Sequence, residues 1–364
     1  MAPAAPDRRP RSGPAMGLSS TSRPPDDTPA ADISIAVCTR DRARQLERAL
    51  RSLTEQSRGA AEILVVDNAP SDDTTRRLVE EVFPGARYVR EEIAGLDFAR
   101  NRALTEATGR VVAFIDDDAV ADPDWVAAIE QVFRDDASVG ACSGRIDPLS
   151  LETAGQRLFE ANGGLFAGGD ERLRVPSGRY RFRWHRHVPM IAWAAGSGSG
   201  CNLAVCRDLA LQLGGFDEAL DLGPVLAGGG DNDMIWRILE SGHEVVYEPG
   251  ARVLHEHRRE THQVVQQILG HQRALVALAT KAVSSASGLQ RIPVFLFLVW
   301  RLTKPGVRLV RRALGRDPLP MPLLLRIWWH CWLGLGAYAE GVRVAQRRNR
   351  AASSSSRPVP GATS

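Results

Sequence analysis

The sequence predicts an α/β protein whose mostly parallel sheet is sandwiched by helices, followed by a helical, basic C-terminal extension. Between residue 33 and about residue 150, short apolar, β-branched runs alternate with segments of helical periodicity. Strands that are continuously apolar and separated by helices are typical of a parallel sheet covered on both faces. After residue 270 the composition becomes basic and rich in Trp, which predicts the separate extension.

The first predicted strand covers residues 33–38, and the helix after it covers 42–53 with Leu46, Leu50 and Leu53 on one side. A further helix is expected to begin at Asp122-Pro123, with an acidic N-cap and proline in the first helical position. The other predicted elements are strands at 62–66, 86–90, 111–115, 244–247 and 251–257, and helices at 72–82, 96–107 and from residue 234.

Polar residues follow three of these strands, at 38–42, 67–73 and 116–118. In a parallel sheet the ligand lies at the carboxyl ends of the strands, so these segments are candidates for a binding site. Turn and cap residues are the alternative interpretation of 67–73, and the 38–42 segment is weak evidence by itself.

The triplet Asp116-Asp117-Asp118 is the strongest of the three signals. Three adjacent carboxylates that leave a buried strand repel one another, and a divalent cation would relieve that repulsion. Alternation along an extended chain puts Asp116 and Asp118 on one side, where they can bind Mg²⁺ or Mn²⁺. Because Mg²⁺ prefers few protein ligands and several phosphate oxygens, a diphosphate-bearing substrate is expected with it. A solvated acidic turn is the alternative.

A second acidic cluster, Asp231 to Asp233, follows three glycines and precedes a helical pattern. Asp231 can cap that helix and also face a cleft. His255 and His257 lie on one face if their segment is extended, although a lone histidine is usually structural. The glycines at 196, 198 and 200 and the pair at 214–215 either let the backbone approach a ligand or form turns.

The composition is that of a folded, soluble protein: 364 residues, 44% hydrophobic, 24% charged, with a net charge of +3. Five scattered cysteines without CxxC pairs exclude a disulfide scaffold or a structural zinc site. Residues 1–31 and 351–364 are expected to be disordered tails. The first tail lacks the apolar segment of a secretory signal, which predicts a cytoplasmic location.

The basic extension is predicted over residues 261–350. Residues 270–350 contain 14 Arg and Lys against two acids, so this segment carries +12 and the rest of the chain −9. Its apolar runs, 292–300 and 319–325, are too short to span a bilayer. Interleaved Trp and Arg on helices favour a helix lying on an anionic membrane, on the inner face of the cell membrane. A solvated basic face is the alternative, and no nucleic-acid motif accompanies the charge.

Six motifs in order resemble family 2 glycosyltransferases: VCTRDR, VVDNAPSDDT, GLDFARNRAL, FIDDDAVADPDWV, GGFDEAL and GGGDNDMIWRILESGHEVVYEP. The resemblance covers residues 33 to about 260 and implies a GT-A type, Rossmann-like domain over 32–260. It also implies a nucleotide-diphosphate sugar donor, a divalent metal (Mg²⁺ or Mn²⁺) and inversion at the anomeric carbon.

The resemblance implies roles for individual residues. Thr39 and Arg40 match the stretch that lines the nucleotide, Asp67 matches the carboxylate that contacts the base, and Arg100 lies near the diphosphate. Asp116, with Asp117, is expected to contact the nucleotide sugar. Asp118 and Asp116 match the outer positions of the DxD motif, and His255 matches a histidine that in some relatives completes the metal site. Asp231 matches the catalytic base, but Gly230 stands where many relatives carry Glu.

The expected function is therefore transfer of a sugar to an acceptor hydroxyl, in cell-surface polysaccharide or glycolipid assembly, with a glycan or lipid-linked acceptor. A nucleotidylyltransferase should have a Gly-rich loop after its first strand, and CTRDR lacks one. A non-catalytic, membrane-associated nucleotide-sugar-binding protein leaves both acidic clusters unexplained. A processive synthase is disfavoured because the QxxRW motif is missing. Residues 150–195 are expected to set acceptor specificity.

Overall fold

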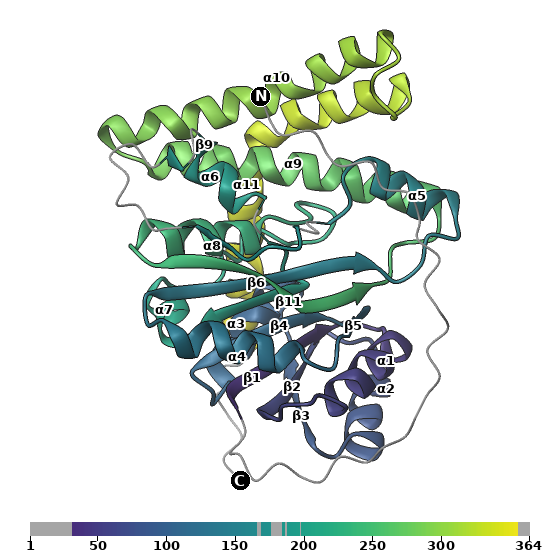
Figure 1. Ribbon diagram of the computed structural model, residues 1–364, viewed down its shortest axis with the longest axis vertical. Coiled ribbons are helices and arrows are strands. Elements are labelled where there is room, and N and C mark those ends of the chain that lie inside the picture. Colours follow the sequence, from purple (N-terminus) through teal and green to yellow (C-terminus); the bar gives the residue numbers. More distant parts are fainter. Residues whose placement is uncertain (1–30, 166–168, 176–183, 186–187, 197, 356–364) are drawn as a thin grey trace, which may run out of the picture.

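A nine-stranded mixed sheet forms the centre of the computed structural model, which describes residues 31–165, 169–175, 184–185, 188–196 and 198–355 (Figure 1). The strand order is β3-β2-β1-β4-β10-β6-β11-β5, and β7 pairs with β11. The strands are β1 (Ala31–Thr39), β2 (Ala60–Asn68), β3 (Ala86–Glu91), β4 (Val111–Asp116), β5 (Ala119–Ala121), β6 (Val139–Pro148), β7 (Leu173–Val175), β10 (Asn202–Cys206) and β11 (Glu244–His255), with β8 (Trp184–His185) and β9 (Val188–Pro189) as a separate pair.

The sheet is less parallel than the sequence predicts. Strands β3, β2, β1 and β4 pair in parallel. Strand β10 lies antiparallel between β4 and β6, so β6 and its parallel partner β11 run in the same direction as β4. Within the described sheet, six strands thus share one direction, and β5, β7 and β10 oppose them. The carboxyl ends of β1, β2, β4 and β11 consequently meet at one edge.

Helices cover both faces of this sheet, as the continuously apolar strands predict. Side chains of β1 alternate between two hydrophobic clusters: Ile35 and Val37 pack with α1 and α4, and Ala36 packs with α3 and α8. The helices are α1 (Ala43–Thr54), α2 (Thr74–Arg77), α3 (Leu96–Glu106), α4 (Trp125–Asp135), α5 (Ala154–Ala161), α6 (Met190–Ala194), α7 (Arg207–Gln212), α8 (Gly230–Glu240), α9 (Thr261–Ser285), α10 (Arg291–Ala313) and α11 (Met321–Ser355), with a π-helical turn η1 (Leu78–Val82) and a 3-10 turn η2 (Gly288–Gln290).

Two local expectations are wrong. Helix α4 begins at Trp125, because the Trp125 N–H donates to the carbonyl of Asp122 at 3.0 Å and closes a turn that holds Pro123 before the helix. The two strands expected at 244–247 and 251–257 form one strand, β11, whose pairing with β6 shifts register between Glu248 and Arg252. Pro249 lies within that irregularity, and its nitrogen has no hydrogen to donate to the ladder.

The C-terminal helices pack on the rest of the protein. Figure 1 shows α9 between the sheet and α10, while α11 runs from that layer past the sheet. In the described part of the chain, no helix has the length and apolar character needed to cross a bilayer. Residues 1–30 and 356–364 of the expected tails lie outside the described residues. Residue 31 begins β1, and residues 351–355 complete the last turns of α11 instead of belonging to a disordered tail.

Candidate active site

The Asp triplet forms the turn between β4 and β5. The hydroxyl of Thr39, at the end of β1, donates to Asp117 at 2.7 Å. The guanidinium of Arg42 bridges the triplet, with one nitrogen 2.7 Å from Asp117 and another 2.6 Å from Asp118. His255, at the end of β11, lies 3.1 Å from Asp118. Three strand ends therefore meet at this turn, as expected from the parallel pairing of β1 with β4.

The electrostatics of the triplet are those of a crowded, poorly hydrated acidic site. Burial and, after it, the negative charge of Asp118 raise the pKa of Asp116 to about 6, against the opposing influence of His255. Burial likewise raises the pKa of Asp117 to about 7, against the opposing influence of Arg42. Burial also disfavours the charged form of Asp118, but His255 and Arg42 outweigh it and hold the pKa of Asp118 below its usual range. A further cation at this site would relieve the remaining repulsion.

Donor atoms suited to a divalent cation gather here. One atom each from Asp116, Cys201 and His255 lies within 4.8 Å of the others. The Asp116 carboxylate forms no hydrogen bond or ion pair with any residue in the described ranges. A carboxylate and an imidazole fit Mn²⁺, and Asp118 reaches the same imidazole. The residues present therefore fit the predicted metal, with one donor atom each from Asp116, His255 and Cys201.

The second acidic cluster lies in the first turn of α8. The backbone N–H of Gly200 donates to Asp231 Oδ2 at 2.7 Å, and the N–H of Asn232 donates to Asp231 Oδ1 at 2.8 Å. The residue before the helix is Gly229, in the left-handed conformation with φ of 103°, which favours glycine. These backbone contacts fix the Asp231 carboxylate at the start of the helix instead of leaving it as a mobile surface group.

A buried network of ion pairs and hydrogen bonds contacts the segment just before Asp231. Asp97 is fully buried and lies 2.9 Å from Arg100, which also lies 3.4 Å from Asp221. The N–H of Gly230 donates to Asp221 at 2.9 Å. A Cβ added at Gly230 would overlap the carboxylate of Asp97, so the acid that many relatives carry before the base has no room here. Instead, Asp97 brings a carboxylate to this place from α3.

Asp231 and the metal-ligand candidates line one cavity of about 450 Å³. Its walls include Asp116 and His255 on one side and Arg100 and Gly200 beside Asp231. Asp118 does not line it, because its carboxylate is engaged by Arg42 and His255. The cavity nevertheless joins the two acidic clusters that the sequence separates by more than 100 positions.

A neighbouring cavity of about 350 Å³ contains other predicted residues. Thr39, Arg40 and Asp117 line it, and Asp116 lines both cavities. Arg40 is exposed and lies only 3.8 Å from its neighbour Asp41. Asn68 lines this cavity as well. The two cavities adjoin one another, because both are lined by Leu96, Asp116 and Asp221.

Asp67 lies at the end of β2, opposite Thr39 in the strand pairing. Its side chain is fully buried, and the Tyr88 hydroxyl donates to Oδ2 at 3.0 Å. Its Oδ1 atom is buried without a hydrogen-bond partner. Burial raises the pKa of Asp67 to about 6. Asp67 therefore lines neither of the two cavities, unlike Thr39 beside it in the sheet.

Several lining residues were missed by sequence reasoning. They are Arg42 and Cys201 near the triplet, Arg301 and Lys304 from α10, and Arg348 from α11. Only Arg42 had a local signal, since it belongs to the polar segment after β1. Cys201 directly precedes β10, and the other three residues lie on α10 and α11, whose sequence pattern shows only helical periodicity.

The segment expected to set acceptor specificity is partly described. Its residues Asn162, Gly163 and Gly164 line the cavity that contains Asp231. Residues 176–183 and 186–187, which include much of the Arg-rich stretch, lie outside the described residues. Gly214 and Gly215 form a turn at the end of α7. Their φ values are 89° and 73°, and their N–H groups donate back to α7 carbonyls. Gly200 instead contacts the site, as a Cβ there would collide with Arg100.

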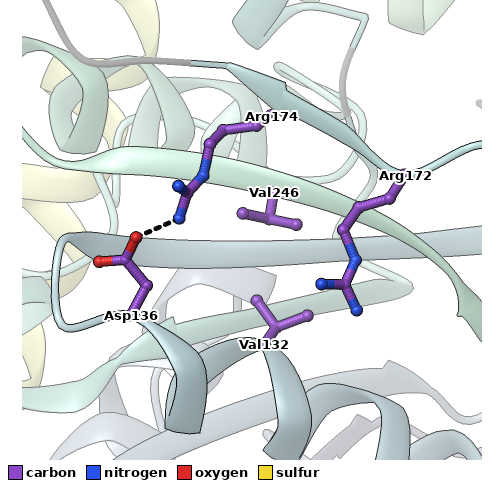
Figure 2. Close-up of a pocket in the computed structure, with 5 residues that line it drawn as sticks. All are labelled: Val132, Asp136, Arg172, Arg174 and Val246. Carbon is purple, nitrogen blue, oxygen red and sulfur yellow. Dashed lines mark hydrogen bonds and ion pairs between the residues drawn. The ribbon is translucent and has the colours of Figure 1, made fainter.

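A third cavity, of about 370 Å³, lies apart from this site (Figure 2). It is lined by Val132, Val246, Asp136, Arg172 and Arg174, and shares none of these residues with the other two. Arg174 forms an ion pair with Asp136, and Arg172 lies 2.5 Å from Glu248. Both cations are already neutralised by carboxylates, and nothing here resembles the chemistry of the acidic clusters.

Comparison with known proteins finds a matching family model and several glycosyltransferases of similar sequence. Residues 34–196 match the family model "Glycosyl transferase family 2". The chain is 28% identical over 244 residues to the pre-mycofactocin glycosyltransferase of Mycobacterium tuberculosis, covering 65% of this chain and 45% of that protein. It is 26% identical over 232 residues to the glucosyl-dolichyl phosphate glucuronosyltransferase of Haloferax volcanii, covering 62% of this chain and 69% of that protein. The chain thus spans under half the length of the mycobacterial relative.

A solved structure shows the same fold. A mannosyltransferase of Pyrobaculum calidifontis, solved in complex with GDP-Man and Mn²⁺, matches with a TM-score of 0.51 at 20% identity, covering 92% of this chain and 79% of that one. The likeness confirms a GT-A-like α/β fold, with the mixed sheet described above in place of the mostly parallel one.

Proposed function

Because the chain belongs to glycosyl transferase family 2 through residues 34–196, we propose that the protein transfers a sugar from a nucleotide-diphosphate sugar to an acceptor hydroxyl with inversion. The observation that carries this proposal is the single cavity lined by Asp231, Asp116 and His255. It brings a candidate proton acceptor and candidate metal ligands to the same space.

Asp231 is the proposed catalytic base. An acceptor hydroxyl is a weak nucleophile, so a carboxylate must take its proton as the bond to the sugar forms. The N–H groups of Gly200 and Asn232 hold both oxygens of Asp231 in place before the acceptor arrives. Such positioning reduces the reorganisation needed to reach the transition state.

The donor is proposed to occupy the two adjoining cavities. Thr39, Arg40 and Asp117 line the nucleotide side, and Arg100, in the cavity of Asp231, is proposed to lie near the diphosphate. Asp67, which lines neither cavity, is proposed to meet the base. A divalent cation, Mg²⁺ or Mn²⁺, held by Asp116 and His255 with Asp118, would neutralise the charge that develops on the departing diphosphate. The mannosyltransferase solved with GDP-Man and Mn²⁺ supports this class of donor and metal.

The alternatives find less support. The segment after β1 lacks the glycines of a nucleotidylyltransferase loop. A non-catalytic binding protein would not need Asp231 fixed at the wall of the same cavity as Asp116. The relatives named above are glycosyltransferases by name.

The acceptor is proposed to be a glycan or lipid-linked glycan, and the protein to work on an anionic membrane surface, on the inner face of the cell membrane. Helices α10 and α11 support this second proposal, because large apolar side chains are exposed beside arginines: Phe295 is 53% exposed and Trp329 is 64% exposed. Rings and cations together suit the headgroup layer. The dolichyl phosphate in the name of the Haloferax relative agrees with a lipid-linked acceptor.

The test is incubation of the full chain with a panel of UDP- and GDP-sugars and Mn²⁺. Slow, metal-dependent release of UDP or GDP from one donor, absent with EDTA, is expected. Production of pyrophosphate would identify a nucleotidylyltransferase, and no release from any donor in the presence of acceptor extracts would contradict transfer.

A further inference from the structure

Helix α10 brings two cations to the cavity of the candidate active site. Arg301 and Lys304, one helical turn apart, both line the cavity that contains Asp231. Arg301 is 5% exposed, so its guanidinium is held inside the protein. Among the described residues, its one hydrogen bond runs from Nη2 to Gln272 Oε1 on α9, at 2.5 Å, and its Nε atom is buried without a partner. Both cations also lie against the Trp300 ring, at 5.6 Å and 4.8 Å from its centroid.

Arg301 is buried and Lys304 is exposed, and neither has a carboxylate partner in the part of the chain that the structure describes. The other arginines near the site differ: Arg100 lies 2.9 Å from Asp97, and Arg308 lies 2.8 Å from Asp317. Burying a cation without an opposite charge is costly, so an unpaired, buried guanidinium facing a cavity indicates an anionic ligand.

The electrostatics agree with this geometry. Burial lowers the pKa of Arg301. Burial, followed by repulsion from Arg301 and Arg308, lowers the pKa of Lys304 to about 8. Both pKa shifts indicate a poorly hydrated site, where an anion between the two groups would favour their charged forms.

The location separates the two cations from the nucleotide part of the donor, which is proposed to lie in the neighbouring cavity. Arg301 and Lys304 line the Asp231 cavity but not the neighbouring cavity with Thr39, Arg40 and Asp117. The acceptor hydroxyl must reach Asp231, whereas the donor nucleotide is proposed to lie on the far side of Asp116. Two adjacent cations match a phosphate, which carries between one and two negative charges, better than a carboxylate, which carries one.

We propose that Arg301 and Lys304 bind a phosphate group carried by the acceptor, an inference that rests on the proposed function. The phosphate comes from a lipid-linked sugar or from a soluble sugar phosphate. The apolar face of the same helix offers contact for a hydrocarbon chain, since Phe295 and Leu296 are 53% and 46% exposed.

Calorimetric titration of the full chain separates these sources. The probes are dodecyl phosphate in neutral detergent micelles, glucose 1-phosphate, and the micelles alone. Wild type is expected to bind at least one phosphate probe, and the micelles alone to give no signal. Tighter binding of dodecyl phosphate assigns the lipid-linked source, and equal or tighter binding of glucose 1-phosphate assigns the soluble one. No binding of either probe to wild type overturns the proposal.

Three variants test the residues. Arg301→Gln and Lys304→Gln should each weaken phosphate binding roughly tenfold or more, through loss of a charge-assisted hydrogen bond. Arg311→Gln, which removes an exposed charge from the same helix, should leave it unchanged. Thermal melting of ligand-free Arg301→Gln should equal or exceed that of wild type, because an unpaired buried charge is removed. Equal phosphate affinity in wild type and both cavity variants would overturn the proposal.

A last measurement distinguishes this proposal from the proposed function. Binding of UDP and GDP with Mn²⁺ should be the same in wild type and Arg301→Gln. If Arg301→Gln weakens nucleotide binding and leaves phosphate-probe binding intact, the cations serve the donor and the inference fails while sugar transfer stands. If no nucleotide sugar is consumed but Arg301-dependent phosphate binding persists, the failure lies in the proposed function.

Discussion

The Nε2 atom of His255 lies 3.1 Å from Oδ1 of Asp118, although 136 residues separate them in the sequence. The contact joins the carboxyl end of β11 to the turn after β4. It forms because β5, which follows the triplet directly, pairs antiparallel with the end of β11 and places Ala119 opposite His255. The strand pairing therefore brings the imidazole to the acidic triplet.

Replacing Asp118 by Ala should weaken Mn²⁺-dependent nucleotide binding by about 10- to 100-fold, the range for lost metal-site partners. The carboxylate holds His255 and Arg42 at the site, whether it contacts the ion directly or through His255. The measurement is a Mn²⁺ titration monitored by nucleotide binding. Asp124→Ala, at an exposed position after β5, is the control, and an unchanged titration in Asp118→Ala would remove Asp118 from the metal site.

Asp231→Asn should retain donor binding and lose most transfer, because the amide still accepts a hydrogen bond from Gly200 but cannot take a proton. General-base catalysis is worth about 10²- to 10⁴-fold, which sets the expected fall in kcat. Turnover with saturating donor and acceptor is the measurement, beside nucleotide affinity as a check on folding. Activity within a few-fold of wild type would exclude the base role. Asp233→Asn would be a poor control, since Asp233 is buried in ion pairs with Arg237 and Lys281.

Gly230→Ala should destabilise the protein by about 1 to 3 kcal/mol, the usual cost of overpacking a buried site. The new Cβ would overlap the Asp97 carboxylate, which is fully buried and tied to Arg100. Gly336→Ala is the matched control: this exposed glycine of α11 has open space around it, and alanine there should stabilise the helix by up to about 1 kcal/mol. Urea unfolding measures both variants. Equal free energies of unfolding for Gly230→Ala and wild type would show that the Asp97 side chain can move aside without destabilising the protein.

Glu62→Gln should lower the free energy of unfolding at pH 7 by roughly 1 to 3 kcal/mol. Burial disfavours the charged form of Glu62, but hydrogen bonds from Ser34, Thr108 and Arg87 outweigh it and hold the pKa at about 2 instead of its ordinary 4.5. Between these values the unfolded chain binds more protons than the folded one. The stabilisation is thus fully present above the unfolded pKa, near 4.5, and is lost as the pH falls toward 2.

Urea unfolding at several pH values tests whether the stabilisation by Glu62 is lost on acidification, as expected. The difference between wild type and Glu62→Gln should be constant from pH 7 to pH 6 and shrink on acidification below about pH 5. Glu80→Gln removes an exposed ion pair with Arg76 and should change stability by less than about 1 kcal/mol at every pH. A difference for Glu62→Gln that grows on acidification would contradict the assignment.

Replacing Trp329 and Trp332 together by Ser should reduce binding to anionic vesicles several-fold while preserving the melting temperature. Both side chains are exposed, at 64% and 49%, so their loss opens no core. Flotation with vesicles of phosphatidylglycerol and phosphatidylcholine measures the effect, and Val82→Ser, an exposed apolar position in η1, is the control. Equal flotation of the double variant and wild type would argue against an interfacial role for α11.

Local pattern was enough to locate most of the elements that hold the site. The apolar runs of β1, β2 and β4 and the polar residues after them are neighbours in sequence, so periodicity and charge indicate both the strand and its functional end. The same holds for Asp231, because three glycines, an acid and a helical pattern are adjacent. Strand β6 was not predicted, because Gly140 and Gly144 interrupt its apolar run.

The sequence by itself determined strands β1 to β4 and β11, the acidic clusters and the basic extension, because each depends on contacts and charges within a few residues of one another. Only the tertiary structure decided that β10 runs against its neighbours, that Asp97 occupies the space beside Gly230, and that Arg301 and Lys304 face the cavity of Asp231. Those relationships join segments far apart in the chain, and they are fixed by which surfaces bury the most apolar area together. No local pattern carries that information.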